Sequence, residues 1–370
     1  MSKVKGNVQD PLELIQEYGT DALRLALTIG ITPGNDFTLS PSTLDARRDF
    51  VNKLWNIGRF VMSSTTGEER RHALQPAAAR EKKTPLAERW IASRLSAVTG
   101  EVTRLLGEFN FGEAGRIIHD FLWDEVADWY VEAFKILARE GQADGVLLAQ
   151  VYEKALRLLH PYAPFATEEL WQRLTTGTAD RPIALMIAPW PEPADARDPA
   201  AEAAWADVMA VTRAARTLRS EYHIKSSNTV AASIAARTPE LAAFWRANAD
   251  LLGALPGARL KPIDVLDAPA GAPADLAARA IAAVAGGVEL LMPAEGLFDV
   301  QTELDRVTQE LADSNGQVVR LERQLASDFS HKAPAETVER ERERLAEQRE
   351  RQQTLERRRV TLARLSETSQ

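Results

Sequence analysis

A lysine-rich turn at the start of the chain carries residues that could act on phosphate groups. Residues 1–7 read MSKVKGN and place Lys3 and Lys5 beside the turn-forming pair Gly6-Asn7. Flexible ammonium groups on such a loop can follow the negative charge that develops on a phosphate during a reaction. Taken alone, this short pattern favours a plain solvated tail, so a phosphate role needs support from the rest of the chain.

A second candidate is one face of the helix predicted over residues 42–62. At 100° per residue its apolar positions gather on one side, at Val51, Leu54, Trp55, Gly58, Val61 and Met62. The other side carries two amides, two cations and an aromatic ring, at Asn52, Lys53, Asn56, Arg59 and Phe60. Single-stranded RNA is read by stacking on aromatic rings and by hydrogen bonds to base edges, so this face suits RNA. The alternative is a solvated helix whose Phe60 packs on a neighbouring helix.

The chain offers little for a metal ion. Its five histidines are scattered without ligand spacing, and it has no cysteine. One acidic cluster could suggest a metal, but its helical spacing favours a capped or solvated face; its members are Asp120, Asp124, Glu125 and Asp128. We expect His160 to be structural, and we expect no metal site.

Composition narrows the function classes. The chain has 370 residues, 45 basic and 53 acidic side chains, and a net charge of −8, which argues against a generally sticky nucleic-acid binder. A negative net charge is still compatible with a local basic patch that contacts RNA. No apolar run reaches the length of a membrane span. Of 24 aromatic residues, all but Phe298 and Phe329 lie in residues 1–245, so the last third is built differently.

The elements that would position these residues are mainly α-helical. Asp10, Pro11 and Glu13 predict a helix start, and Gly19 predicts its end. Helices follow to about residue 245, interrupted by a polar loop predicted over residues 63–84. Residues 228–297 predict a small α/β subdomain, because short β-branched runs alternate with a helix. Gly286-Gly287 between two apolar runs predicts a hairpin turn.

The last seventy residues show a coiled-coil pattern. Apolar residues recur every seven positions, with two more at the matching d positions: Leu304, Leu311, Val318 and Leu325, then Val307 and Leu321. Pro334 breaks the pattern before a second charged helix. We therefore expect an antiparallel helical hairpin, and a single long solvated helix is the alternative.

Several segments resemble class I aminoacyl-tRNA synthetases. SKVKGNVQDPLELIQEYGTDALRLAL resembles their KMSKS signature loop and the run that follows it, although the leading lysine is absent and Val4 replaces the final serine. RRDFVNKLWNIGRF and LHPYAPFATEELWQRL resemble helices of the valyl-tRNA synthetase anticodon-binding domain. GLFDVQTELDRVTQELADSNGQ and the residues after it resemble the coiled-coil arm of the same family.

The resemblance implies a role for each segment. The expected division is 1–40 for the end of the catalytic core, 41–227 for the helical anticodon-binding domain, 228–297 for the α/β linker subdomain and 298–370 for the coiled-coil tRNA-binding arm. By resemblance Lys3 is catalytic, and Ser2 and Lys3 bind ATP. The implied anticodon contacts are Arg48, Asn52, Lys53, Asn56, Arg59 and Phe60. The implied contacts to the tRNA elbow are Arg320, Arg323, Arg340, Arg342 and Arg344.

The same resemblance implies partners and cofactors. The complete enzyme would use ATP with Mg²⁺ to attach valine to tRNA-Val, in the cytoplasm, without membrane or DNA. The sequence shows no HIGH-type motif and no glycine-rich nucleotide loop. We therefore expect this chain alone to be a monomer that binds tRNA, binds no cofactor and forms no valyl-adenylate. Met1 coincides with the methionine of the signature, which suggests a truncated or split reading frame.

Two other functions stay open at this point. One is a free-standing, non-catalytic tRNA-binding or assembly module that acts with a separate catalytic chain. The other is a plain coiled-coil interaction protein with a helical head.

Overall fold

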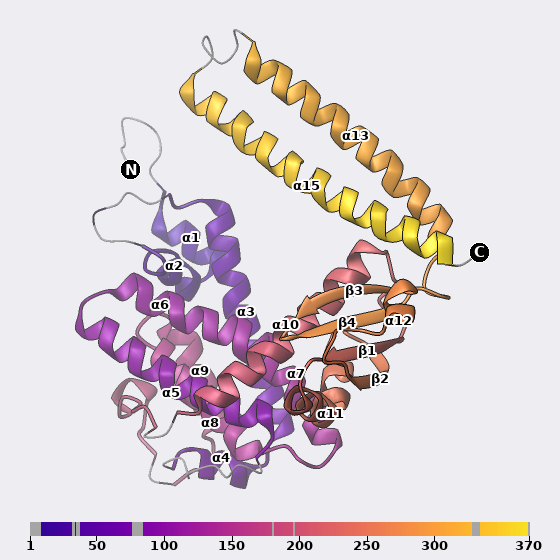
Figure 1. Ribbon diagram of the computed structural model, residues 1–370. Helices are drawn as coiled ribbons and strands as arrows, with labels where there is room; N and C mark the ends of the chain where they lie inside the picture. Colours follow the sequence, from indigo (N-terminus) through magenta and orange to yellow (C-terminus); the bar gives the residue numbers. More distant parts are fainter. Residues whose placement is uncertain are drawn as a thin grey trace. The chain divides into compact units, whose positions relative to one another are not determined.

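The chain folds into two compact units, residues 1–206 and residues 207–370 (Figure 1). The computed structural model describes residues 9–31, 34, 38–75, 84–179, 181–194, 197–327 and 334–368. The predicted signature loop, with Ser2 and Lys3, lies outside these residues. The mainly α-helical class is confirmed, with a helical first unit and a small sheet and a helical hairpin in the second. Within the described residues, no helix combines the length and the hydropathy needed to cross a membrane.

The first unit is a bundle of helices. Their bounds are α1 Pro11–Tyr18, α2 Thr20–Ala26, α3 Pro41–Ser64, α4 Gly67–Ala73, α5 Leu86–Gly107, α6 Phe111–Asp120, η2 Phe121–Tyr130, α7 Val131–Arg139, α8 Gly145–Leu159, α9 Pro164–Leu174, η3 Leu185–Ile187 and the first part of α10 Pro199–Glu221. The predicted start of the first helix is confirmed, because the Asp10 carboxylate accepts a hydrogen bond from the Leu12 amide at 2.8 Å. Gly19, with φ +91°, ends that helix.

Helix α3 is packed tightly against α8. A Cβ atom added to Gly58 would lie 2.6 Å from the Tyr152 hydroxyl oxygen, so only a glycine allows this approach. The Tyr152 hydroxyl donates a hydrogen bond to the Leu54 carbonyl at 2.8 Å, although both groups are buried. This contact fixes the rotation of α3 about its own axis and thereby decides which of its residues point outward.

The loop predicted over residues 63–84 is wrong in its first part. Helix α3 continues to Ser64, and α4 follows from Gly67 to Ala73. Thr66 and Glu69 form a reciprocal capping box, in which each side chain accepts a hydrogen bond from the other residue's backbone amide. This Thr-x-x-Glu spacing was the available sequence signal for a helix start.

The helical stretch from α6 to α7 contains a π-helical segment. Residues Phe121–Tyr130, labelled η2, make hydrogen bonds with the wider π spacing, and α6 and α7 continue on either side. In a π-helix residues five apart lie near the same side, which is not so in an α-helix. The side chains of η2 therefore face different neighbours than the α-helical pattern predicts.

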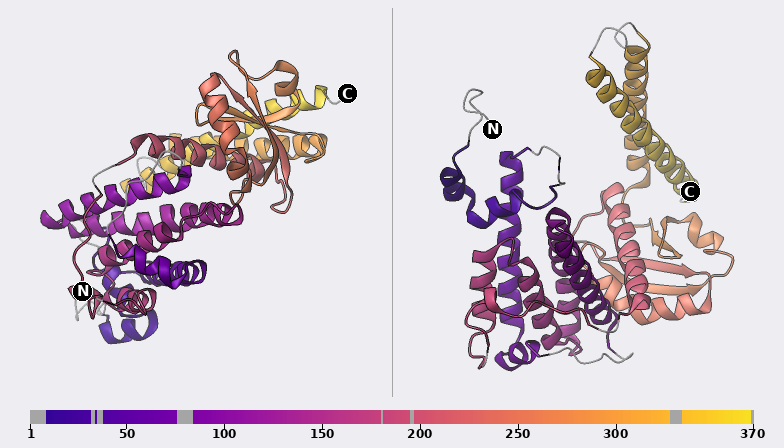
Figure 2. Two further views of the ribbon diagram at one scale, coloured as in Figure 1. Left: turned by 90° about the horizontal axis from the view of Figure 1, so that it is seen from below. Right: turned by 90° about the vertical axis from the view of Figure 1, so that its left-hand side faces the viewer.

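The second unit contains the rest of α10 and a four-stranded sheet. The bounds are β1 Val230–Ala236, α11 Pro239–Ala254, β2 Leu260–Asp267, α12 Ala274–Ala278, β3 Ala280–Ala285 and β4 Val288–Pro293. The strand order is β2-β1-β4-β3, with β1 and β2 parallel and the other pairs antiparallel. Helix α11 packs on β2 and β1 (Figure 2). The predicted hairpin turn is confirmed at Gly286 and Gly287, whose φ angles are +55° and +71°.

The expected antiparallel hairpin is confirmed in the last part of the chain. Helix α13 (Val300–Ala326) and helix α15 (Ala335–Thr368) run side by side in opposite directions (Figure 1). Of the predicted seam, Val307, Val318 and Leu321 are buried, whereas Leu304, Leu311 and Leu325 are half-buried.

Candidate nucleic-acid interface

The outward face of α3 is rotated from the one that the sequence pattern predicts. Phe50 and Ile57 are buried, whereas Trp55 is half-buried. The buried side is therefore displaced by about 60° at 100° per residue. Asn52, Asn56 and Arg59 are exposed and line up along the helix with the half-buried Arg48, and we call these four residues the α3 ridge. Lys53 and Phe60, expected on the same open face, are half-buried at its border.

Lys53 is held by two residues of the π-helical segment. Its Nζ lies 2.7 Å from Asp128 Oδ1 and 3.9 Å from the centre of the Trp123 ring. Trp123 and Asp128 are five residues apart, so the π spacing of η2 turns both toward α3. The ion pair is accessible, because a quarter of the Lys53 side chain and half of the Asp128 side chain are exposed. A lysine ammonium over an indole face is a favourable cation–π contact.

A row of stacked rings supports Trp123 from behind. Its ring is nearly parallel to the His119 ring, with 5.9 Å between the centres, and His119 lies 4.5 Å from Phe50. Burial lowers the pKa of His119, against the opposing influence of Asp120. His119 is thus neutral at pH 7 and acts as a packing residue. The Trp123 face toward Lys53 is therefore held at a fixed position.

Phe60 meets a second pair of residues. Its ring packs edge-on against Phe134 with 6.0 Å between centres, and Lys135 Nζ lies 5.4 Å from the centre of the Phe60 ring. Lys135 also pairs with Glu132 at 2.6 Å. Phe60 thus packs against a neighbouring helix, as the alternative to RNA binding predicted, but its ring remains half-exposed.

The α3 ridge itself carries open hydrogen-bonding groups. Arg48 pairs with Asp45 at 2.7 Å, and its guanidinium lies 5.8 Å from the centre of the Tyr18 ring. Asn52, Asn56 and Arg59 are exposed and make no side-chain hydrogen bond to any residue that the structure describes. Amides that donate and accept, beside a cation and half-exposed rings, can bind base edges and base faces.

Three of the four residues in the acidic cluster, Asp120, Glu125 and Asp128, are paired with basic side chains. Glu125 accepts two hydrogen bonds from Arg94 at 2.8 Å, and Asp120 lies 2.6 Å from Arg116. His160, expected to be structural, lies 2.8 Å from the Thr167 hydroxyl through its Nδ1.

The five arm arginines named from the sequence all lie on exposed positions of the hairpin. Arg342 and Arg344 make long ion pairs with neighbours on their own helix, at 3.3 and 3.4 Å. Arg320, Arg323 and Arg340 pair with no acidic side chain of the described residues. These guanidinium groups are available to phosphates, which they suit by their forked donors.

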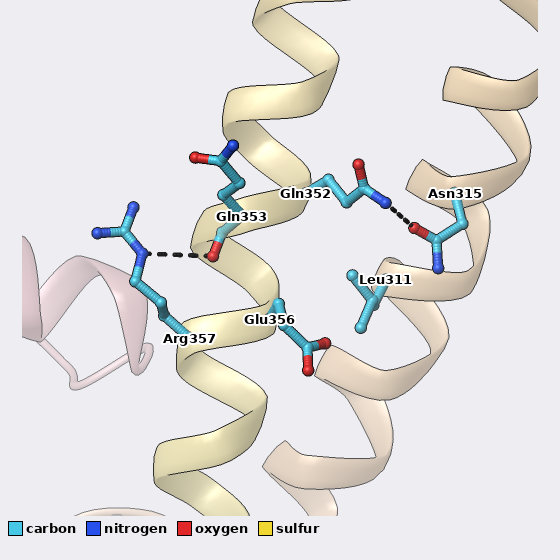
Figure 3. Close-up of a pocket in the computed structure, with 6 residues that line it drawn as sticks. All are labelled: Leu311, Asn315, Gln352, Gln353, Glu356 and Arg357. Atoms are coloured by element: carbon cyan, nitrogen blue, oxygen red, sulfur yellow. Dashed lines mark hydrogen bonds between the residues drawn. The ribbon is translucent and has the colours of Figure 1, made fainter.

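A hydrogen bond between two polar side chains joins the helices of the arm at the exposed border of the seam. Gln352 donates a hydrogen bond from Nε2 to Asn315 Oδ1 at 2.5 Å, next to the half-buried Leu311 (Figure 3). These residues border a pocket of about 660 Å³ between the two helices. Because this hydrogen bond is exposed, it contributes little to the stability of the arm.

A buried ion-pair cluster lies where the arm begins. Glu303 of α13 is ion-paired to Arg358 of α15 and lies 2.7 Å from Arg306. Burial raises the pKa of Glu303, but hydrogen bonds and charges from Arg306 and Arg358 outweigh burial and hold it at about 2. The Arg358 guanidinium also lies 4.8 Å from the centre of the Tyr222 ring. We call Glu303, Arg306, Arg358 and Tyr222 the arm-root cluster. Sequence reasoning missed it, because its members come from α13, α15 and the turn after α10.

Comparison with known proteins relates three parts of this chain to tRNA synthetase families. A family model described as the anticodon-binding domain of tRNA ligase matches residues 88–235, and one described as the valyl tRNA synthetase tRNA binding arm matches residues 299–363. A third, described as tRNA synthetases class I (I, L, M and V), matches residues 1–40.

Curated relatives agree with these models. A valine–tRNA ligase of Dehalococcoides mccartyi is 39% identical over 356 residues, which are 93% of this chain and 38% of the relative. That of Geobacillus stearothermophilus is 35% identical over 376 residues, which are 99% of this chain and 40% of the relative. The chain thus spans about two fifths of the length of the relatives it matches. A solved complex of an Agrobacterium radiobacter LeuRS with tRNA covers 52% of this chain at 26% identity, with a TM-score of 0.39, which is too low to bear on the fold. From the family models and the relatives, this chain belongs to the valyl-tRNA synthetase family, as the C-terminal part that carries the anticodon-binding domain and the arm.

Proposed function

We propose that this chain is the tRNA-binding portion of a valine–tRNA ligase and that it binds tRNA-Val. The α3 ridge, with Lys53 and Phe60 at its border, is the observation that carries the proposal. It combines unpaired amides, a free cation and half-exposed rings on one rigid helix within the described first unit. These are the groups that recognise unstacked bases, such as those of an anticodon loop.

The other segments are assigned by the same proposal. The bundle, residues 41–227, would bind the anticodon, and residues 228–297 would link it to the arm, residues 298–370. The exposed arm arginines would contact backbone phosphates at the tRNA elbow, a contact that positions the RNA without reading its sequence. Residues 1–40, with Ser2 and Lys3, would belong to the ATP-binding end of the catalytic core.

In the complete enzyme, ATP with Mg²⁺ would activate valine before its transfer to tRNA-Val in the cytoplasm. We expect the 370-residue chain by itself to bind tRNA-Val as a monomer and to form no valyl-adenylate. ATP–pyrophosphate exchange measures adenylate formation directly. Exchange by the purified chain would contradict this part of the proposal.

Anticodon reading is tested with two variants of the α3 surface. Asn56→Ala removes an exposed amide, and Lys53→Ala removes the cation held over Trp123. We expect each to weaken binding of tRNA-Val by about tenfold, because contacts to single bases contribute about 1–3 kcal/mol. The loss should vanish when the anticodon of the tRNA is replaced. Arg104→Ala, at an exposed arginine of α5 already paired with Glu101 and Glu108, is the matched control.

Two results would speak against anticodon reading by this face. If the variants bind tRNA-Val as the wild type does, with the same dependence on the anticodon, the α3 surface does not contact the anticodon. If binding weakens equally for every anticodon and its salt dependence decreases, the surface contacts phosphates instead of bases.

A further inference from the structure

A pocket rich in arginine lies in the second unit, at the C-terminal end of α10. It has a volume of about 580 Å³ and is formed by the last turns of α10, the segment before β1 and the turn before β2. Its polar lining consists of three arginines and three serines: Arg216, Arg219, Arg259, Ser220, Ser226 and Ser227. No carboxylate is among the described residues that line it.

Arg219 is the buried cation of this pocket. It is only 5% exposed, and its Nη2 donates hydrogen bonds to the Lys225 and Asn228 carbonyls at 2.8 and 2.7 Å. Its Nη1 is also buried but has no hydrogen-bond partner in the structure. Burial lowers the pKa of Arg219, and the charge of Arg259 lowers it further. A buried cation with an unused donor and a second cation nearby is a costly arrangement unless an anion completes it.

Arg259 is held beside this group in an unusual conformation. Its φ of +45° places it in the left-handed region that a side chain with a Cβ rarely adopts. Its side chain is exposed, and Nη1 donates a hydrogen bond to the Ser227 carbonyl at 3.2 Å. Arg216 donates from Nε to the Pro256 carbonyl at 2.8 Å. Backbone carbonyls thus position the guanidinium groups of Arg219 and Arg259 without neutralising their charge.

We propose that this pocket binds a phosphate of the RNA backbone, as a site distinct from the α3 ridge and from the arm arginines. Forked guanidinium donors match phosphate oxygens, and serine hydroxyls supply further donors. The volume exceeds that of a single phosphate ion, so a phosphate that is attached to its sugars can enter. The proposal rests on the proposed function, since the RNA would be the bound tRNA.

The test uses Arg259→Asn in the full chain, because asparagine tolerates the left-handed conformation while the charge is lost. Arg237→Asn is the matched control: it removes an exposed arginine of the same unit that does not line the pocket. Affinity for tRNA-Val is measured between about 50 and 200 mM salt. We expect Arg259→Asn to weaken binding by roughly 3- to 10-fold at low salt and to reduce the salt slope by about 1, equally for every anticodon. The control should leave the slope unchanged.

The outcomes separate this proposal from the proposed function. If the wild type binds tRNA-Val and Arg259→Asn keeps the wild-type slope with a normal melting temperature, the pocket does not hold an RNA phosphate. If inorganic phosphate raises the melting temperature of the wild type but not of Arg259→Asn, while the tRNA slope is unchanged, the pocket binds free phosphate and the RNA assignment is overturned. If the wild type does not bind tRNA, the proposed function fails as well. Should Arg259→Asn lower the melting temperature, Arg259→Gly, which also accepts a positive φ, replaces it in the same assay.

Discussion

Replacing Glu303 by glutamine should loosen the root of the arm. Glu303 is nearly buried and bonds both Arg306 and Arg358, and its pKa is held at about 2 instead of 4.5. That difference corresponds to about 3 kcal/mol at 1.36 kcal/mol for each pH unit. Arg306 is a third exposed, so solvent screens its share. We therefore expect Glu303→Gln to lower the free energy of unfolding by about 1–2 kcal/mol at pH 7.

The stabilisation by Glu303 depends on pH in a direction that the assay can check. Because folding lowers the pKa of Glu303, the ionised carboxylate stabilises the fold fully above about pH 4.5, and this contribution disappears as the pH falls toward about 2. Urea unfolding followed by circular dichroism at pH 7 and at pH 3 should show a clearly smaller difference between wild type and Glu303→Gln at pH 3 than at pH 7. Glu322→Gln is a suitable control, because its ion pair with Arg349 on the same hairpin is exposed.

Two results would refute this reasoning. Equal unfolding free energies of wild type and Glu303→Gln at pH 7 would mean that the two arginine contacts are offset by the cost of burying the charges. A difference that persists unchanged at pH 3 would mean that the variant acts through packing and not through the ionised carboxylate.

Two further predictions concern contacts between helices. Gly58→Ala should lower the free energy of unfolding by about 1–3 kcal/mol, because the new Cβ would lie 2.6 Å from the Tyr152 hydroxyl. Adding Tyr152→Phe to the same chain should recover part of this loss. A melting temperature of Gly58→Ala equal to that of the wild type would show that α3 and α8 can separate freely. Asn315→Ala should lower the free energy of unfolding by at most about 1 kcal/mol, because the hydrogen bond that Asn315 accepts from Gln352 is exposed and water can replace it. A larger loss would contradict this.

Local patterns in the sequence predicted the elements that depend on local chemistry. The cap at Asp10, the turn at Gly286-Gly287 and the heptad positions Val307 and Val318 are each determined by a few neighbouring residues, and the structure confirms them. Tertiary packing decided the rest. The periodicity of α3 allowed a core face that differs by about 60° from the observed one, and the contact of Gly58 with its neighbour helix selects between them.

The candidate sites, too, were predictable from the sequence only where local spacing determines them. The exposed amides of α3 could be predicted from their spacing, whereas the partners of Lys53 could not, because Trp123 and Asp128 face it only through the π spacing of η2. The pocket around Arg219 had no motif, since its lining residues come from separate stretches of chain.

The π-helical segment has a consequence for insertions and deletions in this protein. A helix with wider turns holds an extra residue between ends that stay fixed. Deleting one residue between Trp123 and Asp128 would let the segment relax to an ordinary α-helix, while the flanking helices α6 and α7 keep their orientation. The edge-on contact of Phe134 with Phe60 follows η2, whereas the His119 stack comes before it. A homologue that lacks one residue there would keep the edge contact of Phe134 with Phe60, but would lose the five-residue spacing that turns Trp123 and Asp128 toward Lys53.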